Sequence, residues 1–243
     1  MDRSNPALRS AAFRDALGHV TGERMTMTGA ATKSAILVLL TIFSAGVVWQ
    51  AMPGRPELVL PATLVGALGG FVVAMIASFR PQTAPITAPL YAVLEGLFLG
   101  AISQIYNARY HGLPAQAVAL TCLTLLAMLF AYRVGWIRAT PNFRRIVVAG
   151  TLGFALFYFV AIILSLFHVN MGFMYDSSPL GIILSLLACG LAALNLVLDF
   201  DLIEKSAQAG APKAFEWYAG FSLLVTLVWM YLEILRLLSR SRN

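Results

Sequence analysis

Acidic side chains inside apolar runs are the residues of this chain that could do chemistry. Of its 11 acidic residues, five lie within or at the ends of long apolar stretches: Glu95, Asp199, Asp201, Glu216 and Glu233. An ionised carboxylate at the centre of a bilayer costs about 2.5–3.5 kcal/mol on insertion scales, so such a group is retained where it is paired, protonated or facing water. The chemistry expected here is the binding and release of protons or cations.

Three of these acids differ in their expected surroundings. Glu95 lies well inside its run, about 12 Å from the end of a helix, and is either part of an ion path or a structural acid hydrogen-bonded to another helix. Asp199 has Asn195 four residues earlier, a polar stripe that predicts a position facing the bundle interior. Asp201 has Lys205 four residues later, so we expect it at the wet rim, as an interface charge or a site residue.

The last apolar run carries polar residues along its whole length. Thr226 and Glu233 are seven residues apart and share one helix face. Glu233 and Arg236 are neighbours three residues apart, so they can neutralise each other. A helix with such a stripe is best explained as the central one, surrounded by the others.

Enzymatic chemistry has little support in this sequence. The three histidines, His19, His111 and His168, are far apart, and the zinc-protease motif His-Glu-x-x-His does not occur. Neither a nucleophile-elbow motif nor a phosphate-binding glycine loop is present. We therefore expect neither an enzyme nor a resident cofactor.

The composition requires lipid around the elements that position these residues. Hydrophobic types make up 59% of the 243 residues and charged types 12%, against roughly 45–50% and about 25% in soluble domains; the mean hydropathy is +0.79. Seven stretches are long enough to span a bilayer, at residues 34–52, 58–79, 87–106, 114–134, 146–168, 179–202 and 215–237. The predicted fold is an all-α polytopic membrane protein, a seven-helix bundle of residues 31–243 after a basic tail of residues 1–30.

Basic residues predict the orientation. With the N-terminus in the cytoplasm, 12 of the 17 lysines and arginines lie on that side, which the positive-inside rule favours. The net charge of +6 is explained in this way, and we expect no nucleic-acid partner. Seven spans place the C-terminus outside, unless the last segment is re-entrant and both ends are inside. Two glycine pairs, Gly66 with Gly70 and Gly96 with Gly100, predict close helix packing.

Three segments of the chain resemble one known family. Residues 88–103 (APLYAVLEGLFLGAIS), 198–203 (LDFDLI) and the final run, with EWY at 216–218 and LEILRL at 232–237, resemble the bacterial branch of the Bax inhibitor-1 family. The similarity extends from about residue 30 onward, with the basic tail outside it. The resemblance implies a seven-helix fold with the last helix central, in a bacterial inner (plasma) membrane.

The resemblance also implies a pH-sensitive calcium leak controlled by acids. Asp199 matches the acid of the sixth helix, Glu95 that of the third, and Arg236 the basic residue late in the seventh. Thr226 stands where the family has a second aspartate. Asp201 or Glu233 could substitute for that aspartate; alternatively, conduction is weak or absent.

Two functions follow as hypotheses. The first is a cation (calcium) leak channel gated by protonation of buried acids, with membrane lipids and calcium or protons as partners and transient calcium at Asp199 and Asp201. Its residues are Asp199, Asp201, Glu95, Thr226, Glu233 and Arg236, with Asn195 and Glu216 secondary. The alternative is a non-conducting regulator that binds other membrane proteins, such as a quality-control protease, with the basic tail as docking arm.

Overall fold

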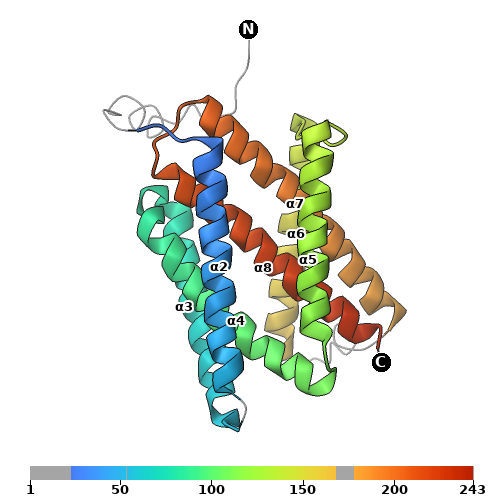
Figure 1. Ribbon diagram of the computed structural model, residues 1–243. Helices are drawn as coiled ribbons and strands as arrows, with labels where there is room; N and C mark the ends of the chain where they lie inside the picture. Colours follow the sequence, from blue (N-terminus) through green and yellow to red (C-terminus); the bar gives the residue numbers. More distant parts are fainter. Residues whose placement is uncertain (1–22, 53, 168–177, 243) are drawn as a thin grey trace.

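Seven long α-helices make up most of the described chain in the computed structural model, which describes residues 23–52, 54–167 and 178–242 (Figure 1). Each is long and apolar enough to cross a membrane, so the prediction of an all-α, seven-helix membrane protein is confirmed. The helices are α2 (Met27–Ala51), α3 (Val59–Phe79), α4 (Ala84–Arg109), α5 (Leu113–Val134), α6 (Pro141–Leu166), α7 (Pro179–Gln208) and α8 (Phe215–Arg240), with short 3-10 turns at Pro56–Leu58 and Pro81–Thr83.

Several helices extend beyond the apolar runs that predicted them. The helix expected at 34–52 begins at Met27, because the Thr26 side chain accepts a hydrogen bond from the Gly29 amide at 2.9 Å and caps α2. α6 begins at Pro141 rather than 146, and α7 continues to Gln208 rather than 202. Hydropathy locates the part of a helix that lies in lipid, whereas capping residues decide where it ends.

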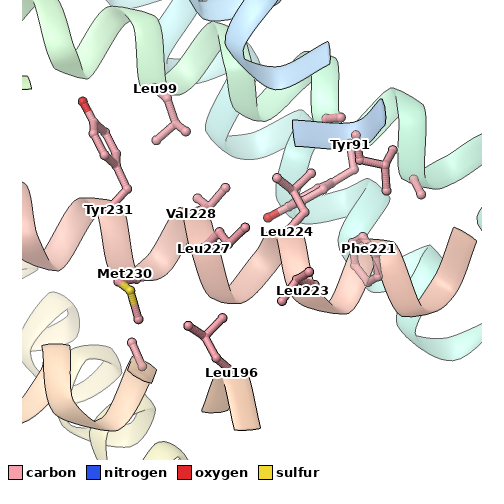
Figure 2. Close-up of a cluster of buried hydrophobic side chains, with 14 of the residues drawn as sticks. Tyr91, Leu99, Leu196, Phe221, Leu223, Leu224, Leu227, Val228, Met230 and Tyr231 are labelled. Atoms are coloured by element: carbon pink, nitrogen blue, oxygen red, sulfur yellow. The ribbon is translucent and has the colours of Figure 1, made fainter. Parts of the chain in front are cut away.

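The last helix is the central one, as predicted. In its most apolar stretch 61% of the residues of α8 are buried, against 6% in α6 and 17% in α3. α8 packs against α2, α4, α5 and α7, and Figure 1 shows it crossing behind α2 and α5. Figure 2 shows its two sides: Leu224, Val228 and Tyr231 point toward α4, while Met230 points toward Leu196 of α7.

Glycines bring the backbones of α2, α3 and α4 together. A Cβ atom at Gly66 would lie 2.7 Å from the Leu94 carbonyl oxygen of α4, and one at Gly96 would lie 2.6 Å from the Thr41 carbonyl oxygen of α2. The Ser44 hydroxyl of α2 donates to the Val93 carbonyl at 2.9 Å across the second contact. The packing predicted for both glycine pairs is confirmed, and α4 is held between two helices by van der Waals contact.

The chain just before α2 belongs to the fold, although the sequence assigned it to a tail. The Met25 amide donates to the Ala211 carbonyl at 2.8 Å, and Glu216 accepts from the Thr26 amide at 3.0 Å and from its hydroxyl at 3.2 Å. Glu216 is 2% exposed. Its carboxylate lies at the positive end of the α2 dipole, which gives it a structural role at the start of that helix.

One ion pair outside the membrane-spanning segments supports this junction. Lys213 donates to the Glu23 carboxylate and lowers the pKa of Glu23 below its ordinary value. The rest of the tail, including most of its arginines and His19, lies outside the described residues, as does His168.

The last helix ends at the opposite end of the bundle from Met27 (Figure 1), and all seven helices are long and apolar enough to span a membrane. Arg240 donates to the Gly181 carbonyl and, at 2.6 Å, to the Ser185 hydroxyl, both in the first turns of α7. Arg242 donates to the Gln116 side chain of α5 at 3.0 Å. These contacts give Arg240 and Arg242 partners within the protein.

The α2–α4 contact can be tested with Gly96→Ala. We expect this variant to lower the free energy of unfolding by about 1–3 kcal/mol, because the new methyl group would meet the α2 backbone. Gly46→Ala is the matched control, since a Cβ there meets no atom within 4 Å. Thermal unfolding in detergent measures both; equal midpoints would contradict the proposed backbone contact.

Candidate functional site

Asp199 lies between α7 and the central helix α8. Its carboxyl oxygens accept hydrogen bonds from two hydroxyls one turn apart on α8, Ser222 to Oδ1 at 2.6 Å and Thr226 to Oδ2 at 2.6 Å. The side chain is buried, and within the described chain it forms no ion pair. We call Asp199, Ser222 and Thr226 the α7–α8 clamp. The sequence predicted the interior position of Asp199 but missed Ser222, whose spacing of four residues from Thr226 was the available signal.

Asp201 points to a different neighbour. It accepts from Arg144 of α6 at 2.7 Å and from Lys205 at 2.8 Å. The pair with Lys205 was predicted, but the wet-rim position was wrong: Asp201 is only 6% exposed because the two cationic side chains cover it. Glu204, one turn before the end of α7, accepts from the Tyr132 hydroxyl of α5 at 2.5 Å. This end of α7 is thus fixed to both α5 and α6.

Glu95 faces α3 rather than the α7–α8 clamp. A Cβ atom at Gly70 would lie 2.9 Å from its Oε1, so the missing side chain of that glycine provides the space for the carboxyl group. Its Oε2 is buried and has no hydrogen-bond partner among the described residues. A carboxyl in such surroundings is costly to ionise without water or a cation nearby.

Glu233 and Arg236 form a second polar cluster toward the other end of α8. The Arg236 guanidinium donates to Glu233 at 3.0 Å, as the spacing predicted, and also to the Tyr158 hydroxyl of α6. Tyr158 donates to Glu233 at 3.1 Å, and the guanidinium lies 5.1 Å from the tyrosine ring centre. The sequence did not identify Tyr158, since nothing local to α8 indicates which helix covers the pair.

Asn195 does not belong to the α7–α8 clamp. Its amide donates to the Thr151 hydroxyl of α6 at 2.8 Å and to the Leu191 carbonyl at 2.9 Å. The polar stripe that joined Asn195 to Asp199 in the sequence therefore serves two different neighbours, α6 and α8. Asn195 holds α6 against α7.

Thr226 alone among the other predicted site residues contacts Asp199 within the described chain. Neither a hydrogen bond nor an ion pair joins any two of Glu95, Asp199, Asp201 and Glu233 there. The described residues contain no group of three metal-ligating side chains, whereas calcium prefers about six to eight oxygen ligands. Asp199 and Asp201, the residues expected to hold transient calcium, therefore belong to no such group among the described residues.

The ion triad at Asp201 can be tested with Arg144→Met. We expect the free energy of unfolding to fall by about 1–2 kcal/mol, since Asp201 keeps Lys205 and Arg144 is partly exposed. Arg145→Met removes the same charge from the next residue, which forms no ion pair in the described chain. If both variants unfold at the same temperature, the Arg144 contact contributes nothing to stability.

Comparison with known proteins identifies the family. No curated protein sequence matches the chain at a significant level. The family model described as Bax inhibitor 1 like matches residues 5–243. The match begins within the basic tail, so the expectation that the tail lies outside the similarity is wrong; that expectation rested on span motifs, which a tail does not contain. Because the match covers nearly the whole chain, this protein belongs to the Bax inhibitor 1 like family.

Proposed function

We propose that this protein is a proton-sensitive cation leak of the membrane, with Asp199 as the group whose charge controls opening. The observation that carries the proposal is the α7–α8 clamp: a buried carboxyl on α7 held by two hydroxyls of the central helix, with no cation paired to it in the described chain. Calcium is the proposed cargo, as the resemblance implies, and no resident metal is needed.

The charge state of Asp199 favours different arrangements of α7 and α8. A neutral acid avoids the cost of burying a charge between α7 and α8, and the two hydroxyls that donate to its oxygens offset only part of that cost for the ionised form. An ionised acid without a cation partner is poorly tolerated in an apolar interior. Ionisation therefore favours separation of the two helices, which admits water and attracts cations to the carboxylate.

The proposed location is a bacterial inner membrane with the Met27 end in the cytoplasm. Most basic residues of the described chain lie at that end. At the opposite end, Arg236 and Arg240 are bonded to Glu233 and to the start of α7. These two arginines therefore count less than solvent-exposed loop lysines and arginines when orientation is inferred from the positive-inside rule.

A non-conducting regulator of other membrane proteins is the second candidate. It is favoured by the separation of the acids, because Asp201 and Glu233 already have cationic partners and Thr226 supplies a hydroxyl rather than a second carboxyl. In this case the acids would be structural, and the basic tail would bind a partner such as a quality-control protease. Reconstituted flux separates the two functions.

Asp199→Asn is the direct test of the leak. In liposomes we expect wild-type calcium flux to rise between about pH 6 and pH 8, whereas the variant stays at the low level, about tenfold below wild type at the upper pH. The reason is that a neutral amide cannot supply the negative charge that concentrates cations.

Glu204→Gln is the matched control for this experiment. It removes one negative charge from the same helix, outside the α7–α8 clamp, and keeps an acceptor for the Tyr132 hydroxyl. Its flux should follow wild type. Equal flux from wild type and Asp199→Asn at every pH would reject Asp199 as the controlling group, and no flux from any form would favour the regulator.

Thr226→Asp tests why the clamp contains a hydroxyl. Two carboxyl groups at hydrogen-bond distance can share one proton, and this shared proton is lost at a higher pH than the proton of a single carboxyl group. We therefore expect the pH midpoint of the flux to rise by about one unit or more. Thr226→Asn, of the same size but uncharged, should leave the midpoint near wild type; a shift of the same size in both variants would contradict the charge explanation.

A further inference from the structure

Cavities lie over the surface of α8 between α2 and α5, the two helices that Figure 1 shows crossing in front of α8. The inner cavity, of about 250 Å³, is lined by residues of α2, α4, α5 and α8. A second cavity of about 710 Å³ continues toward the Met27 end. Val38, Leu125 and Leu227 line both, so the two cavities adjoin, and we call them together the α2–α5 groove.

The inner part of the α2–α5 groove offers almost no hydrogen-bonding capacity. The hydroxyls of Thr41 and Thr121 donate to carbonyls of their own helices at 3.0 and 2.7 Å. Ser103 and Tyr231 bond to each other at 2.6 Å. Figure 2 shows Leu99, Val228 and Tyr231 around this space. Because the polar atoms are already satisfied, the occupant of this part must be apolar.

The other end of the α2–α5 groove is basic. Arg133 lines both the second cavity and an adjoining one of about 620 Å³, whose lining includes Arg138. Neither arginine forms an ion pair in the described chain. The acids in that lining are engaged elsewhere, since Asp201 binds two cationic side chains and Glu204 binds Tyr132.

The dimensions of the groove fit a single acyl chain. From Arg133 to Val118 the groove follows fifteen residues of α5, about 22 Å at the rise of an α-helix. One leaflet of hydrocarbon is about 15 Å thick.

We propose that the α2–α5 groove binds one anionic phospholipid, with an acyl chain in the apolar part and the phosphate at Arg133 and Arg138. The site requires only that the helices lie in a bilayer, so it does not depend on conduction. It places a specific lipid against the central helix, in the leaflet at the Met27 end.

Photoreactive lipids test the proposal with the full-length protein in phosphatidylcholine nanodiscs. The probes are phosphatidylglycerol and phosphatidylcholine that carry the reactive group at the end of one acyl chain, with labelled residues mapped by mass spectrometry. We expect phosphatidylglycerol to label α5 near Cys122 and α8 near Val228 about thirtyfold more strongly than phosphatidylcholine does, because each of the two arginines contributes about 1 kcal/mol near a membrane surface.

Two matched pairs of variants separate the charged end from the apolar end. The double variant Arg133→Gln/Arg138→Gln should reduce phosphatidylglycerol labelling to the phosphatidylcholine level. The control, Arg80→Gln/Arg145→Gln, removes two charges at the same end but outside the groove lining, and it should leave the labelling unchanged. Cys122→Trp, which fills the groove, should reduce labelling by both lipids. Leu123→Trp, on the exposed face next to it, should not.

Three results would overturn the proposal. One is labelling spread evenly over the lipid-exposed helices of the wild-type protein. This result does not depend on whether any variant folds. Another is equal labelling of the groove by both lipids. The third is cross-linking of the groove to a second copy of the chain in place of lipid, which would make it a protein interface.

Discussion

A carboxyl group that is surrounded by apolar side chains needs a partner, and this constraint organises the polar contacts of the bundle. Four of the five buried acids of the described chain meet this need in different ways. Asp199 uses two hydroxyls of α8, Asp201 uses two cations, and Glu233 uses a cation and a phenol. Glu216 uses the free amide and hydroxyl at the start of α2. Most of these hydrogen bonds and ion pairs join one helix to another, so the acids also fix how the helices are arranged.

The contacts that carry no charge explain why α4 can be held tightly in the same bundle. Lipid removes the hydrophobic drive between helices, so close approach through small residues takes its place. Gly66 and Gly96 provide that approach on the α3 and α2 sides of α4. Gly70 differs, because the space it leaves is filled by Glu95 and not by a backbone. A packing glycine therefore also creates the space for the buried Glu95 carboxyl group.

Sequence alone predicted the features that depend on composition and on local spacing. The seven spans follow from hydropathy, the central position of α8 from its polar stripe, and the pairs of Asp201 with Lys205 and Glu233 with Arg236 from helix periodicity. It could not predict Arg144 or Tyr158, which come from α6, a helix far away in the sequence. For the same reason the sequence predicted Asp201 at the wet rim. The side chain that covers it from α6 is brought there by tertiary packing, about which the periodicity of one helix gives no information.

The α7–α8 clamp and the α2–α5 groove lie on opposite sides of α8. Residues two apart on a helix point about 200° away from each other, so Thr226, which faces Asp199, is nearly opposite Val228 and Leu224, which face the groove. In the proposed mechanism, a displacement of α8 away from α7 would move it toward the groove. A bound acyl chain would then be compressed or displaced, whereas an empty groove would offer less resistance. Under the two proposals, the charge of Asp199 and lipid in the groove would act on the position of α8 from its two sides.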